Sequence, residues 1–215
     1  MEENKIQEMN VNVVNDTGFA DPSPVLTLIF ATLCFSFWAN TMGLLGEGAV
    51  LGIGVLQLAV FVSYTIGGVI LLSKGIGFGG NTFMIFATVF GGVGGLTHVS
   101  MTIADAKGVA FCYQLCGIAF IAAGVFLLSM VPALLHKGTV CDVLMFLFGG
   151  LGVLGYGLTG AGIAPAGLNY PSAWCLLVDG VVGFYTVIAG MNGFLGFGKM
   201  PLGGPVLKDR KHYNY

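Results

Sequence analysis

The sequence predicts an all-α integral membrane protein with six transmembrane helices. Of its 215 residues, 56% are hydrophobic and only 8% are charged, whereas soluble domains carry about 25% charged residues. The mean hydropathy is +0.90. Six apolar runs follow one another along the chain, and each has the length of about 20 residues that a bilayer requires. The net charge of −2 gives no argument for a nucleic-acid partner, so the expected surroundings are membrane lipid.

The first predicted span lies in the stretch from Asp21 to Gly46. About twenty apolar residues follow an Asp-Pro-Ser-Pro sequence, and no charge interrupts them before Glu47. Pro22 and Pro24 predict an extended approach to the helix, because proline disfavours helix in the residue before it. Polar residues that recur every fourth position give this helix one mildly polar face. They are Thr32, Ser36 and Asn40.

Charged residues, glycines and prolines separate the five other runs. The predicted spans cover residues 49–73, 81–104, 109–135, 139–160 and 172–197. The predicted organisation is therefore a tail at 1–20, a six-helix transmembrane domain at 21–198 and a second tail at 199–215.

Lysine and arginine predict the orientation. With six spans, both tails share a side of the membrane with the loops after the second and fourth spans. That side holds every Lys and Arg except Lys107. Because cytoplasmic loops carry the excess of positive charge, both tails are expected in the cytoplasm and the protein in the cell (plasma or inner) membrane.

Glycines within the apolar runs predict close contacts between helices. Residues 90–94 (FGGVG) in the third run are echoed by residues 148–152 (FGGLG) in the fifth. Two interpretations stay open: a tight helix crossing, or a constriction that both segments share.

Two ionisable residues lie within predicted spans. An Asp at the centre of a membrane helix costs about 2.5–3.5 kcal/mol on insertion scales and usually faces a cavity or a partner, which makes Asp179 a candidate proton site. His98 is the second candidate, because histidine titrates near physiological pH. A structural hydrogen bond is the alternative for each. Asp142 is expected to cap the fifth span, and Gln57 to bond between helices.

Enzymatic chemistry is not predicted. The chain has no Gly-x-Ser-x-Gly, His-Glu-x-x-His or P-loop sequence, so no catalytic residue is assigned. The five cysteines lie within or beside apolar runs and are expected to be buried thiols. No metal and no cofactor are expected. A channel or an ion-coupled carrier is therefore the predicted class.

Three short motifs occur in order along the chain. They are residues 21–25 (DPSPV), residues 80–83 (GNTF), and residues 197–199 (FGK) followed by 201–204 (PLGG). They are similar to the Asn-Pro-Ala-Pro-Leu, Gly-Asn-Thr-Phe and Phe-Gly-Arg…Leu-Pro-Ile-Gly sequences of the acetate uptake transporter family, which includes the bacterial succinate–acetate permease and the yeast acetate and ammonia transporters. The chain resembles a distant member of this family from Asp21 to Pro205, and the motif residues Asp21, Pro22 and Pro24 mark the mouth of the first span.

The resemblance implies six helices around a pathway in each protomer and assembly as a homo-hexamer. In the family a Phe, a Tyr and a Leu narrow the pathway. The matching positions are Phe30, Gly91 and a position near Gly149, so only the Phe is kept. Glycine at the other two predicts a wider neck unless Phe90 and Phe148 fill it.

The first functional hypothesis is transport of a small monocarboxylate, acetate above all and succinate next, coupled to protons. Asn81 and Thr82 would hold the carboxylate at the start of the third span, where unpaired helix N–H groups favour an anion. The solute would then pass Phe30, and Asp179 or His98 would carry the proton. The predicted pathway residues are Phe30, Asn40, Asn81, Thr82, Phe90, Gly91, Phe148 and Gly149.

Two alternatives remain. The first is a channel for a small neutral solute such as urea, an amide or ammonia, favoured by the lack of Lys or Arg within any predicted span. The second is a membrane scaffold or sensor without transport, in which the glycines serve packing alone.

Overall fold

The protein is described by a computed structural model that covers residues 18–198 and 200–207. Six helical spans in this part of the chain are long and apolar enough to cross a membrane, which confirms the predicted all-α, multi-pass membrane class. Their bounds are α2 Ser23–Thr41, α3 Ala49–Ser73, the third span α4 Gly77–Phe86 with η1 Ala87–Gly94 and α5 Gly95–Lys107, α6 Gln114–Lys137, α7 Val140–Gly160, and α8 Asn169–Phe194 after the short η2 Ala166–Leu168. Of the predicted tails, residues 1–17, 199 and 208–215 lie outside the described residues.

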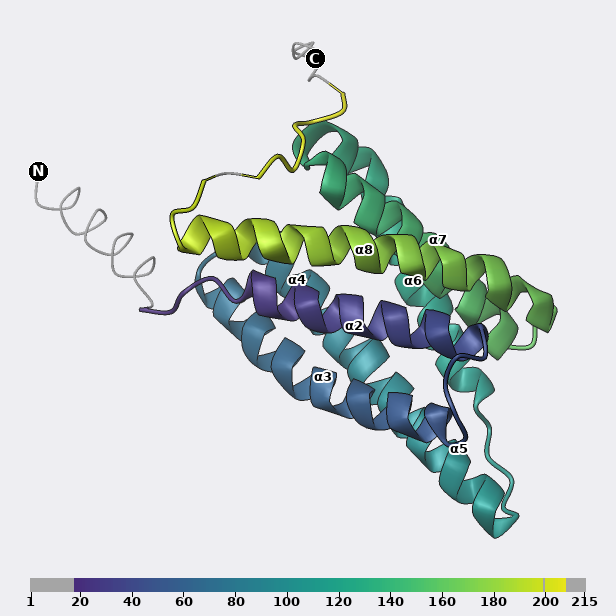
Figure 1. Cartoon of the computed structure of the whole chain (residues 1–215). Coiled ribbons are helices and arrows are strands. Elements are labelled where there is room, and N and C mark those ends of the chain that lie inside the picture. The colour runs from purple at the N-terminus through teal and green to yellow at the C-terminus, as the bar shows by residue number, and fades with distance from the viewer. Residues whose placement is uncertain (1–17, 199, 208–215) are drawn as a thin grey trace, which may run out of the picture.

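The six spans form a closed ring in chain order. α2 packs against both α3 and α8, and α3 packs against all three parts of the third span. The ring closes because η1 contacts α6, α6 packs on α7, and α7 packs on α8. Figure 1 shows α2 lying between α3 and α8. This arrangement surrounds a single axis, along which a solute pathway is to be sought.

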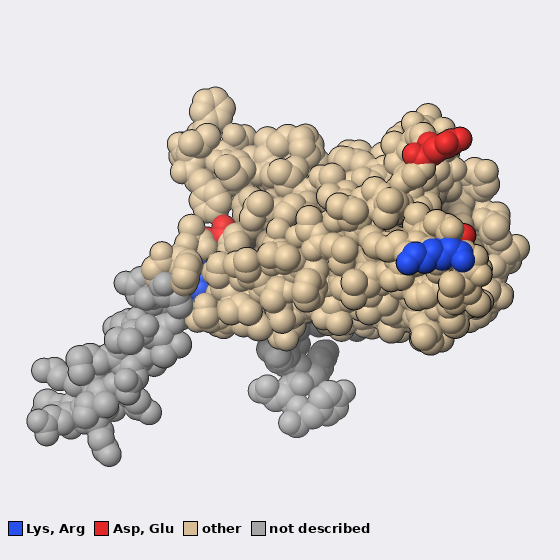
Figure 2. All heavy atoms as spheres, turned by 90° about the horizontal axis from the view of Figure 1, so that it is seen from below, with Lys and Arg blue, Asp and Glu red and all other residues tan. Residues whose placement is uncertain are grey.

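The outer surface matches a hydrocarbon environment. On the face drawn in Figure 2, the charged side chains of the described residues lie at the two ends, and the surface between them carries no charge. Along α3, Val55, Val62, Ile66 and Val69 are all more than half exposed. Such a wide exposed apolar surface is expected where lipid replaces water.

The third span begins earlier than predicted. The glycine-rich residues before Asn81 read as a loop, because glycine favours turns, but the helix starts at Gly77. Gly80 explains the difference: a Cβ there would lie 2.6 Å from Leu72 Cγ of α3. Its missing side chain therefore serves close contact between α3 and α4 and does not mark a turn.

The middle of the third span is a π-helix. Over Ala87–Gly94 the backbone follows the wider i→i+5 pattern, which is rare and often occurs at functional sites. Two other spans keep their predicted bounds closely: 49–73 coincides with α3, and α7 starts at Val140. The first span ends at Thr41, before Gly46, and the predicted extended approach is wrong, because Pro22 is in the right-handed helical conformation and Pro24 lies in the first turn. The fourth span starts at Gln114 and not at residue 109, and the sixth covers Asn169–Phe194 and not 172–197.

Glycines join α7 to both of its neighbours. A Cβ at Gly157 would lie 2.5 Å from the backbone nitrogen of Ile121 in α6, and one at Gly152 would lie 2.6 Å from Leu176 Cδ2 in α8. Helices in lipid gain stability from such close packing. For these glycines the structure supports a tight crossing, one of the two interpretations left open by the sequence.

Candidate functional site

Three cavities lie inside the ring. The proximal cavity, of about 230 Å³, lies at the first turns of α2, α4 and α7. The central cavity is much smaller, about 30 Å³, which is room for about one water molecule. The distal cavity, of about 320 Å³, lies at the opposite ends of these spans and at the start of α6 and α8. None of the three is lined by α3.

Shared side chains connect the three cavities end to end. Phe30 lines both the proximal and the central cavity. Phe37, Phe120 and Tyr156 line both the central and the distal cavity. The partitions between the cavities are therefore aromatic side chains.

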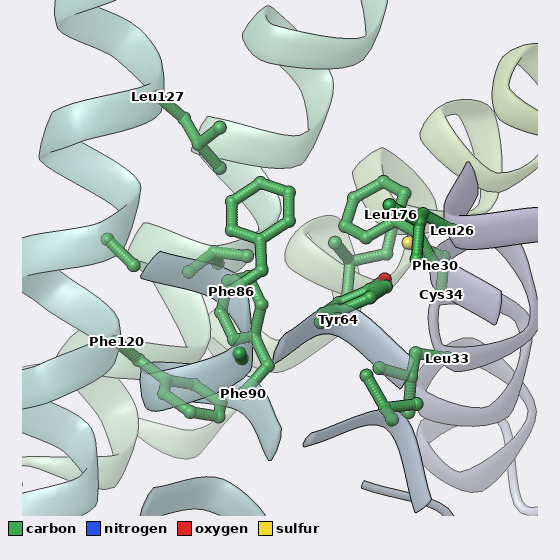
Figure 3. Close-up of a cluster of buried hydrophobic side chains, with 14 of the residues drawn as sticks. Leu26, Phe30, Leu33, Cys34, Tyr64, Phe86, Phe90, Phe120, Leu127 and Leu176 are labelled. Atoms are coloured by element: carbon green, nitrogen blue, oxygen red, sulfur yellow. The ribbon is translucent and has the colours of Figure 1, made fainter. Parts of the chain in front are cut away.

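Four phenylalanines form the narrow neck around the central cavity. The rings of Phe30 and Phe86 are stacked, with centroids 5.4 Å apart. Phe90 lies 5.0 Å from Phe86 and 5.4 Å from Phe120, which it meets edge to face. Figure 3 shows Phe86 and Phe90 following one another along the third span, with Phe120 of α6 beside Phe90. The neck offers a polar solute few hydrogen-bond partners.

The proximal cavity carries hydroxyl groups and one carboxylate. The hydroxyl of Thr82 donates to the carbonyl of Phe78 at 2.9 Å, and Ser23 donates from both N–H and Oγ to Asp21 Oδ1. Asp142 lies in the wall and forms the predicted cap: its Oδ2 accepts from the N–H of Thr139 at 2.8 Å. Within the described residues that line this cavity, Asp142 is the sole charged side chain.

The distal cavity is lined by neutral hydrogen-bonding groups. His98 Nδ1 lies 2.6 Å from Oε1 of Gln57, a side chain of α3 that is fully buried. Thr159 donates its hydroxyl to Asn169 Oδ1 at 2.5 Å. Tyr156 donates to the carbonyl of Phe37 at 3.2 Å and also bonds Thr41. Gln57 thus makes the predicted interhelical bond.

The predicted pathway residues divide into two groups. Phe30, Phe90, Thr82 and the candidate proton site His98 line the cavities. The other predicted pathway residues do not. They are Asn40, Asn81, Gly91, Phe148 and Gly149.

Gly91 and Gly149 do not widen the neck. A Cβ at Gly91 would lie 2.6 Å from Phe61 Cα, so this glycine faces α3. A Cβ at Gly149 would overlap Asp179 Oδ2 of α8. Phe90, which is 5% exposed, lines the central cavity in the place of a family Tyr at the neighbouring position 91. Phe148 is half-buried and lies outside the cavity walls.

Asn81 does not lie at a helix start. Because α4 begins at Gly77, Asn81 sits in the second turn, is exposed, and donates its amide to the carbonyl of Gly77 at 2.8 Å. The expected anion site at Asn81 and Thr82 is therefore corrected: unpaired N–H groups of this helix belong to its first turn, where Gly79 lines the proximal cavity. Asn40 is half-buried, one residue before the end of α2.

Asp179 is fully buried beside the pathway. Its Oδ2 accepts from the thiol of Cys34 at 3.7 Å, and its Oδ1 has no partner among the described residues. The hydroxyl of Tyr64 is likewise buried without a partner in the described part of the chain, and Figure 3 shows it on the Cys34 side of its helix. Cys34 lines the central cavity, so one side chain separates Asp179 from the neck.

Sequence reasoning identified Phe30 and Phe90 of the neck and missed the other two phenylalanines. Phe86 lies four residues before Phe90, so the helical repeat could have placed both on one face. Phe120, Val153 and Leu176 also line or flank the central cavity. Each is one apolar residue in an apolar helix, and no sequence signal separates it from a lipid-facing neighbour.

Comparison with known proteins supports the fold. No protein-family model and no curated protein sequence matches the chain. The structure is similar to the one described as "Structure of the bacterial acetate channel SatP", with a TM-score of 0.65 and 18% sequence identity over 83% of this chain and 96% of that chain. The resemblance to the acetate uptake transporter family seen in the sequence motifs is thus confirmed at the level of the fold.

Proposed function

We propose that this chain, which shares the six-span fold of an acetate channel, conducts small monocarboxylates across a membrane, with acetate as the first candidate. The observation that carries the proposal is the row of three cavities along the ring axis, joined through shared aromatic side chains. Transport without catalysis is consistent with a site made of hydroxyls, amides and aromatic rings.

The solute crosses the neck as the protonated, neutral acid. An ionised carboxylate loses most of its hydration in a cavity of about 30 Å³, and burying an unpaired charge costs far more than burying a neutral hydroxyl. Among the described residues that line the three cavities, none is Lys or Arg, and Asp142 repels an anion. Each acid molecule therefore carries one proton with it, which makes transport proton-coupled.

The same argument ranks the substrates. Succinate has two carboxyl groups, so it needs two protons to become neutral, and it is longer than acetate. The neck therefore favours acetate over succinate. Asp179, one side chain from the neck, would influence the proton's passage through Cys34.

The proposal includes the assembly and the orientation. A homo-hexamer in the cell membrane, with both termini in the cytoplasm, would place the proximal cavity on the cytoplasmic side. On that side the described Lys74 follows α3 and Lys137 ends α6, and on the other side Lys107 ends α5, in agreement with the positive-inside rule.

Uptake of labelled acetate into proteoliposomes tests the function. We expect uptake above that of protein-free vesicles, saturable and stimulated by an inward proton gradient. Phe120→Trp adds volume within the neck and should lower uptake, whereas Phe184→Trp, on a residue that is 45% exposed, should not. Absence of acetate uptake by correctly folded protein would contradict the proposal.

A neutral solute is the second candidate, because none of the described residues that line the cavities is Lys or Arg. Urea, acetamide and ammonia permeation in the same vesicles distinguishes the two. Rapid passage of these solutes without acetate uptake would favour the neutral-solute channel.

A further inference from the structure

We propose that His98 and Gln57 form a carboxyl-binding site in the distal cavity, at which the substrate and the protein exchange the transported proton. This inference rests on the proposed function and deepens it, because it names the group that recognises the acid. His98 would contact the substrate, and Gln57 would position His98.

The hydrogen bond to Gln57 fixes the form of the imidazole. An amide oxygen can only accept, so the 2.6 Å contact between Gln57 Oε1 and His98 Nδ1 places a hydrogen on Nδ1. In the neutral ring the lone pair is then on Nε2. His98 lines the distal cavity, so the ring can offer this lone pair to a solute.

Close packing holds the pair rigidly. A Cβ at Gly54 would lie 2.9 Å from His98 Cβ, and one at Gly94 would overlap Gln57 Nε2. Both glycines therefore let α3 approach the third span at the junction of η1 and α5. Gln57 is 0% exposed and its Nε2 has no partner among the described residues. A buried donor without a partner lowers stability, so stability alone does not account for a glutamine at this position.

His98 is the titratable side chain of this cavity whose ordinary pKa lies closest to neutral pH. The titratable side chains that line the cavity with it are Tyr113 and Cys116 at the start of α6 and Tyr156 of α7, whose ordinary pKa values lie well above 7. α2 contributes Phe37, whose ring is 6.0 Å from that of His98, and α8 contributes Asn169. None of the described lining residues carries a permanent charge.

Two protonation states of the complex contain the same atoms. An imidazolium can donate from Nε2 to a carboxylate, or a neutral imidazole can accept at Nε2 from a protonated acid. Transfer of one proton from Nε2 to the carboxylate oxygen converts the first state into the second. The neutral acid then enters the neck, and His98 takes its next proton from the water of the distal cavity. Transport in the reverse direction uses the same steps backwards.

Direct observation of the histidine tests binding without flux. The chain has three histidines, so ¹⁵N-histidine labelling with His136→Gln and His98→Gln variants assigns the His98 resonances. We expect acetate to shift the His98 Nε2 resonance, and acetamide at equal concentration to shift it less. A His98 resonance that acetate leaves unchanged would overturn the proposal, whatever the flux.

Transport kinetics give the second test. His98→Gln keeps a hydrogen-bonding group but removes the titration, so half-saturation by acetate should weaken about tenfold, as for the loss of one hydrogen bond. Uptake should also lose the part of its pH dependence that comes from titration of the imidazole, and it should keep the part that comes from the protonated fraction of acetate. His136→Gln, at the opposite end of the ring, should keep both properties. Wild-type kinetics in His98→Gln would refute the role of His98, whereas a wild-type protein without acetate uptake would refute the proposed function.

Gln57→Leu tests positioning. We expect the ¹⁵N spectrum of His98 to change from one tautomer to a mixture, together with weaker acetate binding. A tautomer unchanged in Gln57→Leu would contradict the role given to Gln57.

Discussion

The two Phe-Gly-Gly segments are nearly identical in sequence, but they differ in helix type, in where the phenylalanine points and in what the glycines contact. Residues 90–94 lie within a π-helix, and Phe90 points into the neck between Phe86 and Phe120. Residues 148–152 lie within the regular helix α7, and Phe148 lies outside the cavity walls. Gly91 presses on the backbone of α3, whereas Gly149 makes room for a carboxylate of α8.

This difference shows that a short repeat determines where helices can pack closely, but it does not determine the role of each residue in it. In both segments glycine permits a close helix approach. The wider turn of the π-helix changes the angular position of the residues that follow it, so the same pattern directs its phenylalanine to a different neighbour. The repeat therefore does not form a symmetric constriction.

The largest expected effect is the difference between truncating Phe90 and truncating Phe148. Phe90→Ala should destabilise the protein by about 3 kcal/mol, the lower end of the cost of truncating a buried Phe, because packing rather than transfer from water stabilises helices in lipid. It should also raise acetate flux by opening the neck. Phe148→Ala should change the stability and the acetate flux much less. Thermal unfolding in detergent and vesicle uptake measure the pair, and equal effects would contradict the asymmetry.

Gly91 and Gly149 should differ in whether a second mutation restores the stability lost when each is replaced by alanine. Gly91→Ala and Gly149→Ala should each cost about 1–3 kcal/mol through overpacking. Asp179→Ala should relieve the cost at Gly149, since the side chain is the obstacle. Phe61→Ala should not relieve Gly91→Ala, since the nearest atoms there are the Phe61 backbone and its Cβ, which alanine keeps. Double-mutant cycles of unfolding free energy decide both cases.

The smallest expected effect concerns the N-terminal ends of α7 and α4, the first helices of the spans that carry the two segments. α7 has a capping box between Thr139 and Asp142, whereas α4 starts without a side-chain cap. Thr139→Ala should therefore lower the free energy of unfolding by about 1 kcal/mol. Thr82→Ala, in the second turn of α4, is the control for losing a threonine away from a cap. A null result for Thr139→Ala would show that the bilayer, and not the cap, fixes the start of α7.

The spans were predictable because hydropathy is a local property. The bounds 49–73 of α3 follow from an apolar run that ends at Lys74. The start of the third span was not predictable in this way, because Gly77–Gly80 looks the same whether it forms a turn or a helix pressed against Leu72. That choice depends on a neighbouring helix.

The cavity walls were predictable only in part. His98 and Thr82 stand out as polar residues in apolar helices, and both line cavities. Asn81 stands out equally, yet its amide is satisfied by its own helix. The direction in which Phe120 points depends on the rotation of α6 about its axis, which is set by contacts with α7 and η1. An all-apolar sequence does not indicate this rotation.

The position of α3 offers a practical site for a reporter. This helix lines none of the three cavities, yet it holds Gln57 against His98. Its outward residues Val62, Ile66 and Val69 are more than half exposed. A fluorophore attached at one of them would therefore not contact the transported solute. It would lie on the same helix as the Gln57 amide that contacts His98, so the occupancy of the distal cavity could be followed by fluorescence during transport.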